Sequence, residues 1–344
     1  MEDGPTGRAE SAAVPSGIDA TVAHQARIYD YWMGGEDNFA VDREAAEQAI
    51  AAYPAILRGV RAQRAFLARA VGYLVEQAGI RQFLDIGTGV PTANNTHEVA
   101  QAAAPDARIV YVDNDPMVLA HARALLTGSS HGATAYLDAD LREPDKILAG
   151  ASDLLDFRQP VAVLLIGILQ LIPDKDDPHA IVARLVGAVP PGSWLAVYHP
   201  ASDIDRVRVA EAVRRVNARS AGTTTLRSHD EISRFFDGLH LLAPGLVQVQ
   251  RWQPGAAAPD DGEEIAAYAG LARKPADGTA SGGGRLWGRV FAGSCRSRSA
   301  GRTCPSRCRW RARRSRSGCA SRSPECCSNA TAAGCCSTPA STRR

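Results

Sequence analysis

The segment Phe83-Leu84-Asp85-Ile86-Gly87-Thr88-Gly89 is an apolar stretch that ends in two closely spaced glycines, and a helical pattern begins soon afterwards at Asn95. The apolar residues predict a buried strand at Gln82–Ile86. Glycines let a ligand approach the backbone closely, and ligands of open α/β sheets sit beyond the carboxyl ends of the strands. Gly87, Thr88 and Gly89 are therefore predicted to bind a ligand, although a tight turn without a ligand would show the same pattern.

Strands and helices alternate along the chain around this segment. The predicted strands are Gln82–Ile86, Arg108–Val112, Ala133–Leu137, Val161–Ile166, Trp194–Tyr198, Leu246–Gln250 and Ile265–Ala272. The predicted helices cover residues 57–78, 95–103, 116–126, 145–150, 178–189, 204–219 and 230–236. This alternation is typical of an α/β fold with right-handed crossovers. We expect a Rossmann-like, mostly parallel seven-stranded sheet with helices on both faces.

Acidic and polar residues follow the second and third predicted strands. Asp113 and Asn114 end the second strand, while Asp138, Asp140 and Leu141 lie at the end of the third. A carboxylate at the first of these places can accept hydrogen bonds from both ribose hydroxyls of a nucleoside, and one at the second can accept from an adenine amino group. Each acid alone could equally be a solvated loop residue or a helix cap. Their occurrence at successive strand ends favours a nucleoside site.

The turn after the first strand distinguishes between two nucleoside cofactors. A dinucleotide fold prefers Gly-x-Gly-x-x-Gly, but here Pro91 and Thr92 follow Gly89 and the third glycine is missing. Asp85 precedes the turn, and an acid suits an ammonium group better than a pyrophosphate. S-adenosylmethionine, a nucleoside that carries an amino acid, fits both ends. The sequence therefore favours this cofactor over a nicotinamide dinucleotide.

Further motifs resemble those of a known family. They are Ala26–Phe39, Arg81–Thr92, His97–Ala100, Tyr111–Pro116, Asp138–Arg142, Pro191–Ser193 and Tyr268–Pro275. In these the chain resembles the actinobacterial S-adenosylmethionine-dependent methyltransferases that were once catalogued as a domain of unknown function. The resemblance covers about residues 20–275. It implies the class I methyltransferase fold and S-adenosylmethionine as cofactor. We expect no metal ion at the site.

The substrate side of the site is predicted from residues outside the cofactor motifs. A predicted lid precedes the first strand and consists of Tyr29, Asp30, Tyr31 and Trp32. Their helix can fold over the cofactor. Alternatively, its aromatic residues simply pack on the sheet. Gln170 stands where the family usually has His. His199, at the end of the fifth strand, could orient or deprotonate the methyl acceptor, or could be a solvated or capping residue. Tyr29 and His199 are the candidate catalytic residues.

The composition changes sharply near residue 276. The whole chain has 344 residues and a formal charge of +2, but residues 1–275 carry 25 basic and 35 acidic residues, for a net charge of −10. Residues 276–344 carry 14 Arg, two acids and all eight cysteines, for a net charge of +12. An acidic body without cysteines suits the cytoplasm, and the longest apolar run, Val161–Ile172, is shorter than the roughly 20 residues of a membrane span.

The two ends of the chain are predicted to be disordered, at residues 1–20 and 276–344, around a methyltransferase domain at 21–275. The C-terminal tail has one Leu, one Val and one Phe, too few to form a core. It could be a basic arm that binds nucleic acid, a zinc-binding segment, or the product of a shifted reading frame in GC-rich DNA. We favour the shifted frame.

The sequence supports one main function and two alternatives. The main hypothesis is methyl transfer from S-adenosylmethionine to a small molecule, because the acidic body would repel a nucleic acid, which only the tail could bind. A protein of the same fold could instead bind or sense S-adenosylmethionine without catalysis. A nicotinamide-dependent oxidoreductase is disfavoured by Pro91 and Thr92.

Overall fold

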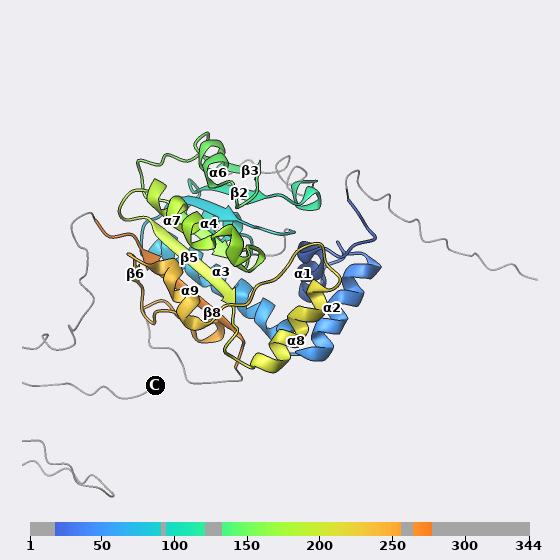
Figure 1. Cartoon of the computed structure of the whole chain (residues 1–344). Helices are drawn as coiled ribbons and strands as arrows, with labels where there is room; N and C mark the ends of the chain where they lie inside the picture. Colours follow the sequence, from blue (N-terminus) through green and yellow to red (C-terminus); the bar gives the residue numbers. More distant parts are fainter. Residues whose placement is uncertain (1–17, 91–93, 121–132, 256–263, 277–344) are drawn as a thin grey trace, which may run out of the picture. The chain divides into compact units, whose positions relative to one another are not determined.

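The computed structural model of the chain describes residues 18–90, 94–120, 133–255 and 264–276 (Figure 1). Its α-helices are α1 (Gln25–Met33), α2 (Ala40–Ala52), α3 (Ile56–Glu76), α4 (Thr96–Ala103), α6 (Pro144–Ala151), α7 (Pro178–Ala188), α8 (Arg206–Asn217) and α9 (His229–Ser233). Its strands are β1 (Gln82–Ile86), β2 (Arg108–Asp113), β3 (Ala133–Asp138), β4 (Ala162–Ile166), β5 (Trp194–Pro200), β6 (His240–Leu241), β7 (Val247–Gln248) and β8 (Ala267–Arg273). Two predictions fall at least partly outside the described residues. They are the disorder of the two ends, at residues 1–17 and 277–344, and the last part of one helix, at residues 121–126.

The strands form one sheet in the order β3-β2-β1-β4-β5-β8-β6, with β7 paired to β8. The first five strands are parallel, and β8 runs antiparallel between β5 and β6. The sheet is therefore mostly parallel, as predicted. It has eight strands rather than seven because His240–Leu241 adds a short strand at the edge.

The predicted strand Leu246–Gln250 is largely replaced by other structure. Only Val247–Gln248 pairs with β8, and a 3₁₀ turn follows at Val249–Arg251. Val249 and Trp252 are both fully buried, and Arg69 of α3 donates from Nε to the Trp252 carbonyl oxygen over 3.0 Å. The chain bends toward α3 because burial of these two side chains stabilises the fold more than a longer pairing with β8 would.

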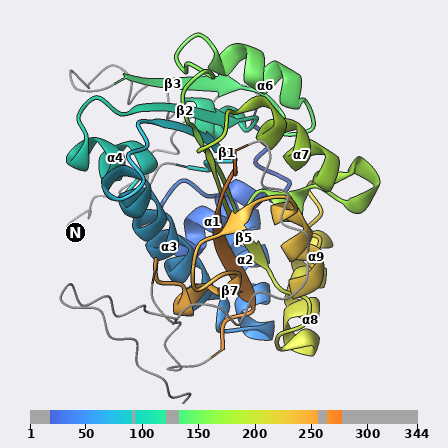
Figure 2. The same ribbon diagram turned by 90° about the vertical axis from the view of Figure 1, so that its left-hand side faces the viewer.

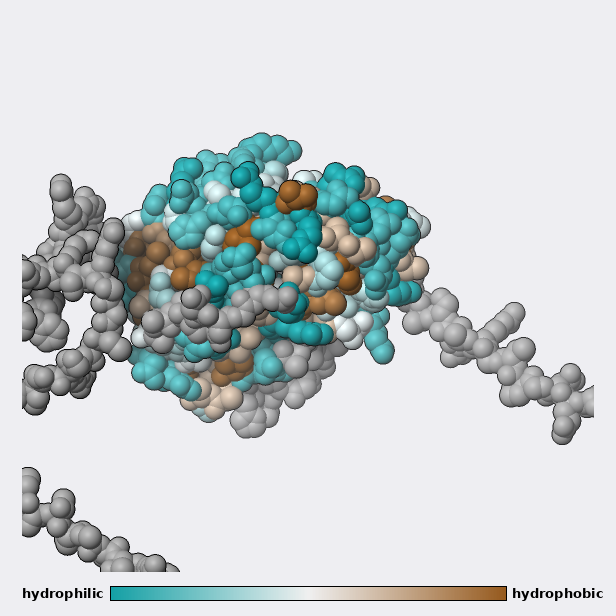
Figure 3. All heavy atoms as spheres, turned by 90° about the horizontal axis from the view of Figure 1, so that it is seen from below, coloured by the Kyte–Doolittle hydropathy of each residue, from teal (hydrophilic) through white to brown (hydrophobic). Residues whose placement is uncertain are grey.

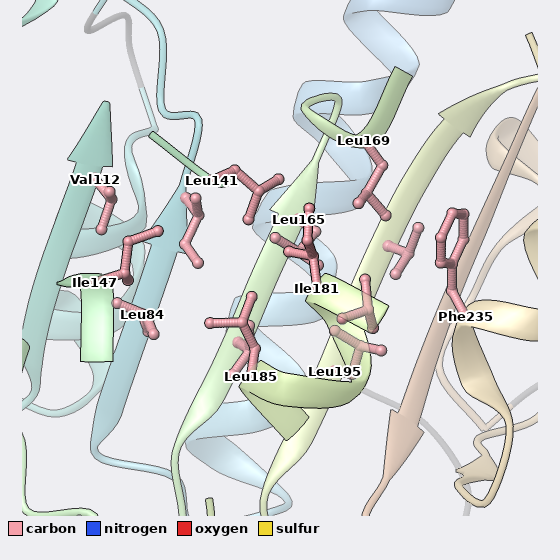
Figure 4. Packing of buried hydrophobic residues seen from close by; sticks show 14 of the residues in the cluster. Leu84, Val112, Leu141, Ile147, Leu165, Leu169, Ile181, Leu185, Leu195 and Phe235 are labelled. Atoms are coloured by element: carbon pink, nitrogen blue, oxygen red, sulfur yellow. The ribbon is translucent and has the colours of Figure 1, made fainter. Parts of the chain in front are cut away.

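Helices cover both faces of the sheet (Figure 2). Successive side chains of a strand point to opposite faces, so Leu84 packs with α6 and α7 while Phe83 packs with α3 and α4. Figure 4 shows the first of these layers, where Ile181 and Leu185 of α7 lie against side chains of the strands. This two-sided burial explains why β4 is apolar along its whole length.

A third cluster joins α1, α2 and α8 beside the sheet. Arg27 of α1 pairs with Asp42 of α2, with 2.8 Å between Nε and Oδ2, and both side chains are almost fully buried. Asp42 also accepts hydrogen bonds from the backbone N–H groups of His24 and Phe39. A buried pair with satisfied hydrogen bonds fixes geometry more than it adds stability. The pair therefore fixes the position of α1.

The surface of the described residues is mostly polar. Figure 3 shows hydrophilic residues over much of one face, with smaller hydrophobic areas between them. Val22, Val207 and Leu241 are the large hydrophobic residues that the described part of the chain exposes. None of the helices described here combines the length and apolar character needed to cross a membrane.

Candidate functional site

A cavity of about 270 Å³ lies where β1, β2, β3 and β4 end. Eight of the nine predicted cofactor residues line it: Asp85, Gly87, Thr88, Gly89, Asp113, Asn114, Asp140 and Leu141. Three of the predicted substrate-side residues line it as well: Tyr29, Trp32 and Gln170. Asp138, Asp30, Tyr31 and His199 are not among its lining residues.

The glycine turn gives the cavity its floor. Gly87 and Gly89 have φ of 75° and 65°, a left-handed conformation that other residues rarely adopt. A Cβ on Gly87 would lie 2.5 Å from the Ile168 side chain, whereas a Cβ on Gly89 would meet no atom of the described residues within 4 Å. Gly87 is therefore required by the packing of this chain, while Gly89 leaves open space within the cavity.

Asp113 links the end of β2 to this turn. Its Oδ2 accepts from the Gly89 N–H over 2.9 Å, and its Oδ1 accepts from the Asp115 N–H over 3.0 Å. Burial raises the pKa of the Asp113 carboxyl, and these amide hydrogen bonds oppose the rise. A carboxylate has about four acceptor positions, so Asp113 keeps acceptor capacity for a ligand.

Asp85 is the most deeply buried acid of the cavity wall, with 6% of its surface exposed. The Thr96 hydroxyl donates to its Oδ2 over 2.6 Å. Burial raises the pKa of Asp85 to about 6, although the Thr96 hydrogen bond and the Arg64 guanidinium oppose the rise. Burial disfavours the charged form of this carboxyl, so a cation that binds beside it stabilises the charged form.

The acids after β3 lie in different environments. Asp138 is exposed at the end of the strand, whereas Asp140, two residues later, lines the cavity. Asp140 accepts from Asn114 Nδ2 over 3.0 Å and from Arg142 Nη1 at the same distance. Arg142 also pairs through Nε with Asp176, over 2.8 Å. Asn114 and Asp140 thus form one polar edge of the cavity.

One face of α1 forms a wall of the cavity. Gln25, Tyr29 and Trp32 have the spacing of one helix face, and all three line it. The other two predicted lid residues point elsewhere. Asp30 is buried and accepts from Asn38 Nδ2 over 2.9 Å, while the Tyr31 hydroxyl donates to Glu47 of α2 over 2.5 Å.

His199 is fully buried outside the cavity. Its Nδ1 lies 2.8 Å from the Pro200 carbonyl oxygen, which can only accept, so Nδ1 carries the proton and Nε2 accepts from Arg227 Nη1 over 2.9 Å. Burial lowers the pKa of His199 to about 3. The same guanidinium donates to the carbonyl oxygens of Leu169 and Ile172. His199 and Arg227 thereby support the loop that carries Gln170.

Comparisons with known proteins match this geometry to a family. A family model described as S-adenosyl methyltransferase matches residues 11–275. This chain belongs to that family. A DUF574 family protein from Streptomyces avermitilis has a similar crystal structure, with 44% identity, a TM-score of 0.71, and coverage of 75% of this chain and 99% of that chain. A protein from Thermobifida fusca, provisionally named a methyltransferase, has 37% identity, a TM-score of 0.71, and coverage of 76% and 98%. No curated protein matches the sequence.

Membership of the S-adenosyl methyltransferase family confirms the predicted fold class and the predicted cofactor, S-adenosylmethionine. The cavity fits that cofactor in three respects. Gly89 leaves room beside the backbone, Asp113 keeps acceptor capacity for hydroxyl groups, and the buried carboxyl of Asp85 suits a positively charged group.

Sequence reasoning missed several lining residues of this family member. His24, Gln63 and Arg64 all line the cavity. Arg64 belongs to a stretch of α3 that also contains Arg58 and Arg61, and such a charge pattern is typical of a solvated helix face. Gln63 donates from Nε2 to the Ile166 carbonyl oxygen over 3.0 Å. Nothing in the sequence of α3 distinguishes these two residues from their polar neighbours.

Proposed function

We propose that this protein transfers a methyl group from S-adenosylmethionine to a small-molecule acceptor. The observation that carries the proposal is the convergence of four parallel strand ends on one cavity that contains the buried Asp85 and the backbone-anchored Asp113. Family membership supports the same activity.

Each part of the cofactor is assigned to residues of suitable chemistry. Asp113, with Asn114 beside it, binds the ribose hydroxyls, and Asp140 with Leu141 holds the adenine. Gly87, Thr88 and Gly89 form the turn beneath the cofactor, and Asp85 accepts the amino group. We place Arg64 near the carboxylate of the methionine part, because its guanidinium lies in the same cavity wall. Asp138 is exposed, and we give it at most an indirect part.

The bound cofactor supplies an activated methyl group on a sulfonium sulfur. The chain has mainly to orient the two reactants and exclude water. Burial raises the pKa of Tyr29 to about 12, so at neutral pH its hydroxyl is protonated and can donate a hydrogen bond to a ligand rather than act as a base. His199 has no access to the cavity and acts as a positioning residue for the Gln170 loop.

The experiment separates catalysis from mere binding. Titration calorimetry of the full chain with S-adenosylmethionine should give a micromolar dissociation constant. Incubation with methyl-labelled cofactor and a metabolite extract should then release S-adenosylhomocysteine and label a small molecule. Binding without any label transfer would favour the non-catalytic sensor, and failure to bind the cofactor would refute the proposal.

A further inference from the structure

A second cavity of about 120 Å³ lies beside the first. Most of its lining residues come from α1, α3, β5, α8 and the residues just before β8, and others, such as Tyr53 and Gln170, come from the ends and connections of further elements. The residues common to both cavities are Gln25, Tyr29, Trp32, Gln63 and Gln170. The second cavity therefore adjoins the predicted cofactor site, and the two have these five residues as a shared wall.

The second cavity is lined by uncharged residues. Aliphatic and aromatic side chains predominate, and no Asp, Glu, Lys, Arg or His occurs among the described residues that line it. Its three tyrosines, Tyr29, Tyr53 and Tyr198, have pKa values raised mainly by burial, so all three are neutral at pH 7. A charged ligand would lose its hydration here without meeting an opposite charge, which is costly.

Two buried polar atoms in the shared wall have no hydrogen-bond partner among the residues that the structure describes: the Tyr29 hydroxyl oxygen and Gln170 Oε1. Gln170 Nε2 donates to the Gly167 carbonyl oxygen over 2.5 Å, which fixes the orientation of the amide. Gln170 Oε1 can therefore only accept, while the Tyr29 hydroxyl can donate. Buried polar groups are nearly always paired in folded proteins, so both atoms point to a ligand.

We propose that the second cavity binds the methyl acceptor and that this acceptor is a small, neutral, mostly apolar ring compound with a hydroxyl group, of the phenol class. A hydroxyl can satisfy both atoms through a single oxygen, because it can donate to Gln170 Oε1 and accept from the Tyr29 hydroxyl. An engineered apolar cavity of about 150 Å³ holds benzene, so this cavity of about 120 Å³, which adjoins the first, admits at most one ring.

This inference rests on the proposed function. Methylation of such a hydroxyl forms a C–O bond, breaks the C–S bond of the sulfonium with its electron pair left on sulfur, and releases the hydroxyl proton to water. The cavity's aliphatic wall holds the ring, and the shared wall places the hydroxyl toward the cofactor side.

The first test is binding of defined probes to the full chain in the presence of S-adenosylhomocysteine, measured by calorimetry. We expect p-cresol to bind about tenfold more tightly than toluene, the scale of one satisfied buried hydrogen bond. Benzoate and benzylammonium should bind undetectably. Equal binding of toluene, tighter binding of either ion, or no binding of p-cresol would each overturn the inference.

The second test fills the cavity. Gly59 of α3 lines it, and a Cβ there would make ordinary contacts, 3.6 Å from Ile265 and 4.0 Å from the Tyr198 hydroxyl. Gly59→Leu should therefore place its larger side chain in the cavity and weaken p-cresol binding by about tenfold or more, while the protein still binds S-adenosylmethionine. Gly72→Leu is the matched control, because a Cβ at Gly72 of the same helix meets no atom of the described residues within 4 Å. A folded Gly59→Leu protein that binds p-cresol normally would refute the site.

A third variant covers the case in which Gly59→Leu does not fold. Gln170→Leu removes Oε1 and should abolish the preference for p-cresol over toluene by weakening p-cresol alone. A retained preference would refute the role of Gln170. Failure of the parent chain to bind S-adenosylmethionine would instead refute the proposed function, so the two failures are distinguishable.

Discussion

Asp113 Oδ2 accepts a hydrogen bond from the Gly89 N–H over 2.9 Å, which joins the end of β2 to the turn after β1. The backbone N–H of Gly87 strengthens the same junction, because it donates to the Val112 carbonyl oxygen over 2.7 Å. A carboxylate held in this way loses little conformational freedom when a ligand binds. Asp113 thus shapes the turn and presents its remaining acceptor positions in one geometry.

Replacing Asp113 should weaken cofactor binding more than it weakens the fold. Asp113→Ala removes the carboxylate and should cost about 1.5–3 kcal/mol of binding free energy, the scale of a lost charge-assisted hydrogen bond. Titration calorimetry with S-adenosylmethionine measures the change. Asp138→Ala is the control, since Asp138 is exposed at the end of the neighbouring strand. This variant should bind S-adenosylmethionine with the affinity of the parent. Unchanged affinity in Asp113→Ala would remove Asp113 from the site.

The glycine turn allows backbone strain to be separated from ligand contact. Gly89→Ala and Gly79→Ala both put a side chain at positive φ, of 65° and 70°, with nothing within 4 Å of the new Cβ. Each should lower stability by about 1–2 kcal/mol. Gly89→Ala alone should also weaken cofactor binding, because Gly79 lies outside the cavity. Equal affinities in the two variants would show that the space beside Gly89 is not used by the ligand.

Much of the cofactor side could be predicted because strand ends determine it. The sequence pattern located the ends of β1 and β2 to within one residue, and Gly89 and Asp113 follow from those ends. The end of β3 was less informative. Asp138 is still part of the strand and exposed, and the chain has to continue to Asp140 before an acid reaches the cavity. Sequence alone does not tell which acid of Asp138-Ala139-Asp140 turns inward.

The substrate side was harder to predict because a one-residue difference reverses the face of a strand. His199 was placed near the cleft from its position at the end of β5. Its neighbour Tyr198 is the residue that lines the second cavity, while His199 points to the opposite face and meets Arg227. Arg227 lies 28 residues further along the chain, and no pattern in the sequence connects the two.

Asp85 should make the stability of the protein fall as pH rises. Burial raises the pKa of Asp85 to about 6, above its ordinary value. Between about pH 4 and 6 the folded state therefore binds more protons than the unfolded chain, and the free energy of unfolding decreases with pH. Asp85→Asn removes this dependence. As the pH rises from about 4 to 6, the free energy of unfolding of the variant should therefore increase relative to that of the parent, by up to about 3 kcal/mol. Urea unfolding across this range measures the difference, and parallel profiles would contradict the assignment.

His199 should prove structural rather than catalytic. His199→Leu leaves a buried N–H of Arg227 without its acceptor, which should lower the free energy of unfolding by about 1–3 kcal/mol. The pKa of His199 is about 3, so its titration should be absent from the pH profile of methyl transfer near neutrality. His179→Leu is the control, because no hydrogen-bond partner of the His179 ring Nδ1 occurs in the described part of the chain. A rate profile of the parent whose ionisation near pH 6–7 disappears in His199→Leu would restore a catalytic role.

Deleting residues 277–344 should leave the fold and cofactor binding intact. The closing strand β8 pairs with β5 along its whole length, from Trp194 opposite Arg273 to Pro200 opposite Ala267. Lys274 then anchors the end of the domain, because its Nζ donates to the carbonyl oxygens of Val186 and Val189 over 3.0 Å and 2.7 Å. These contacts all precede the deletion. The deleted segment holds one Leu, one Val, one Phe and two Trp, so it offers little apolar area to bury.

A longer deletion supplies the contrast for this last prediction. Removing residues 264–344 takes away β8 and leaves β5 with an unpaired edge, so this variant should fail to fold. Thermal melting of the parent and both truncations, with and without S-adenosylmethionine, measures the outcome. If the tail is a nucleic-acid arm, the parent should also bind RNA with a steep salt dependence that the shorter truncation loses. A large drop in melting temperature after removal of residues 277–344 would show that the domain extends beyond Pro275.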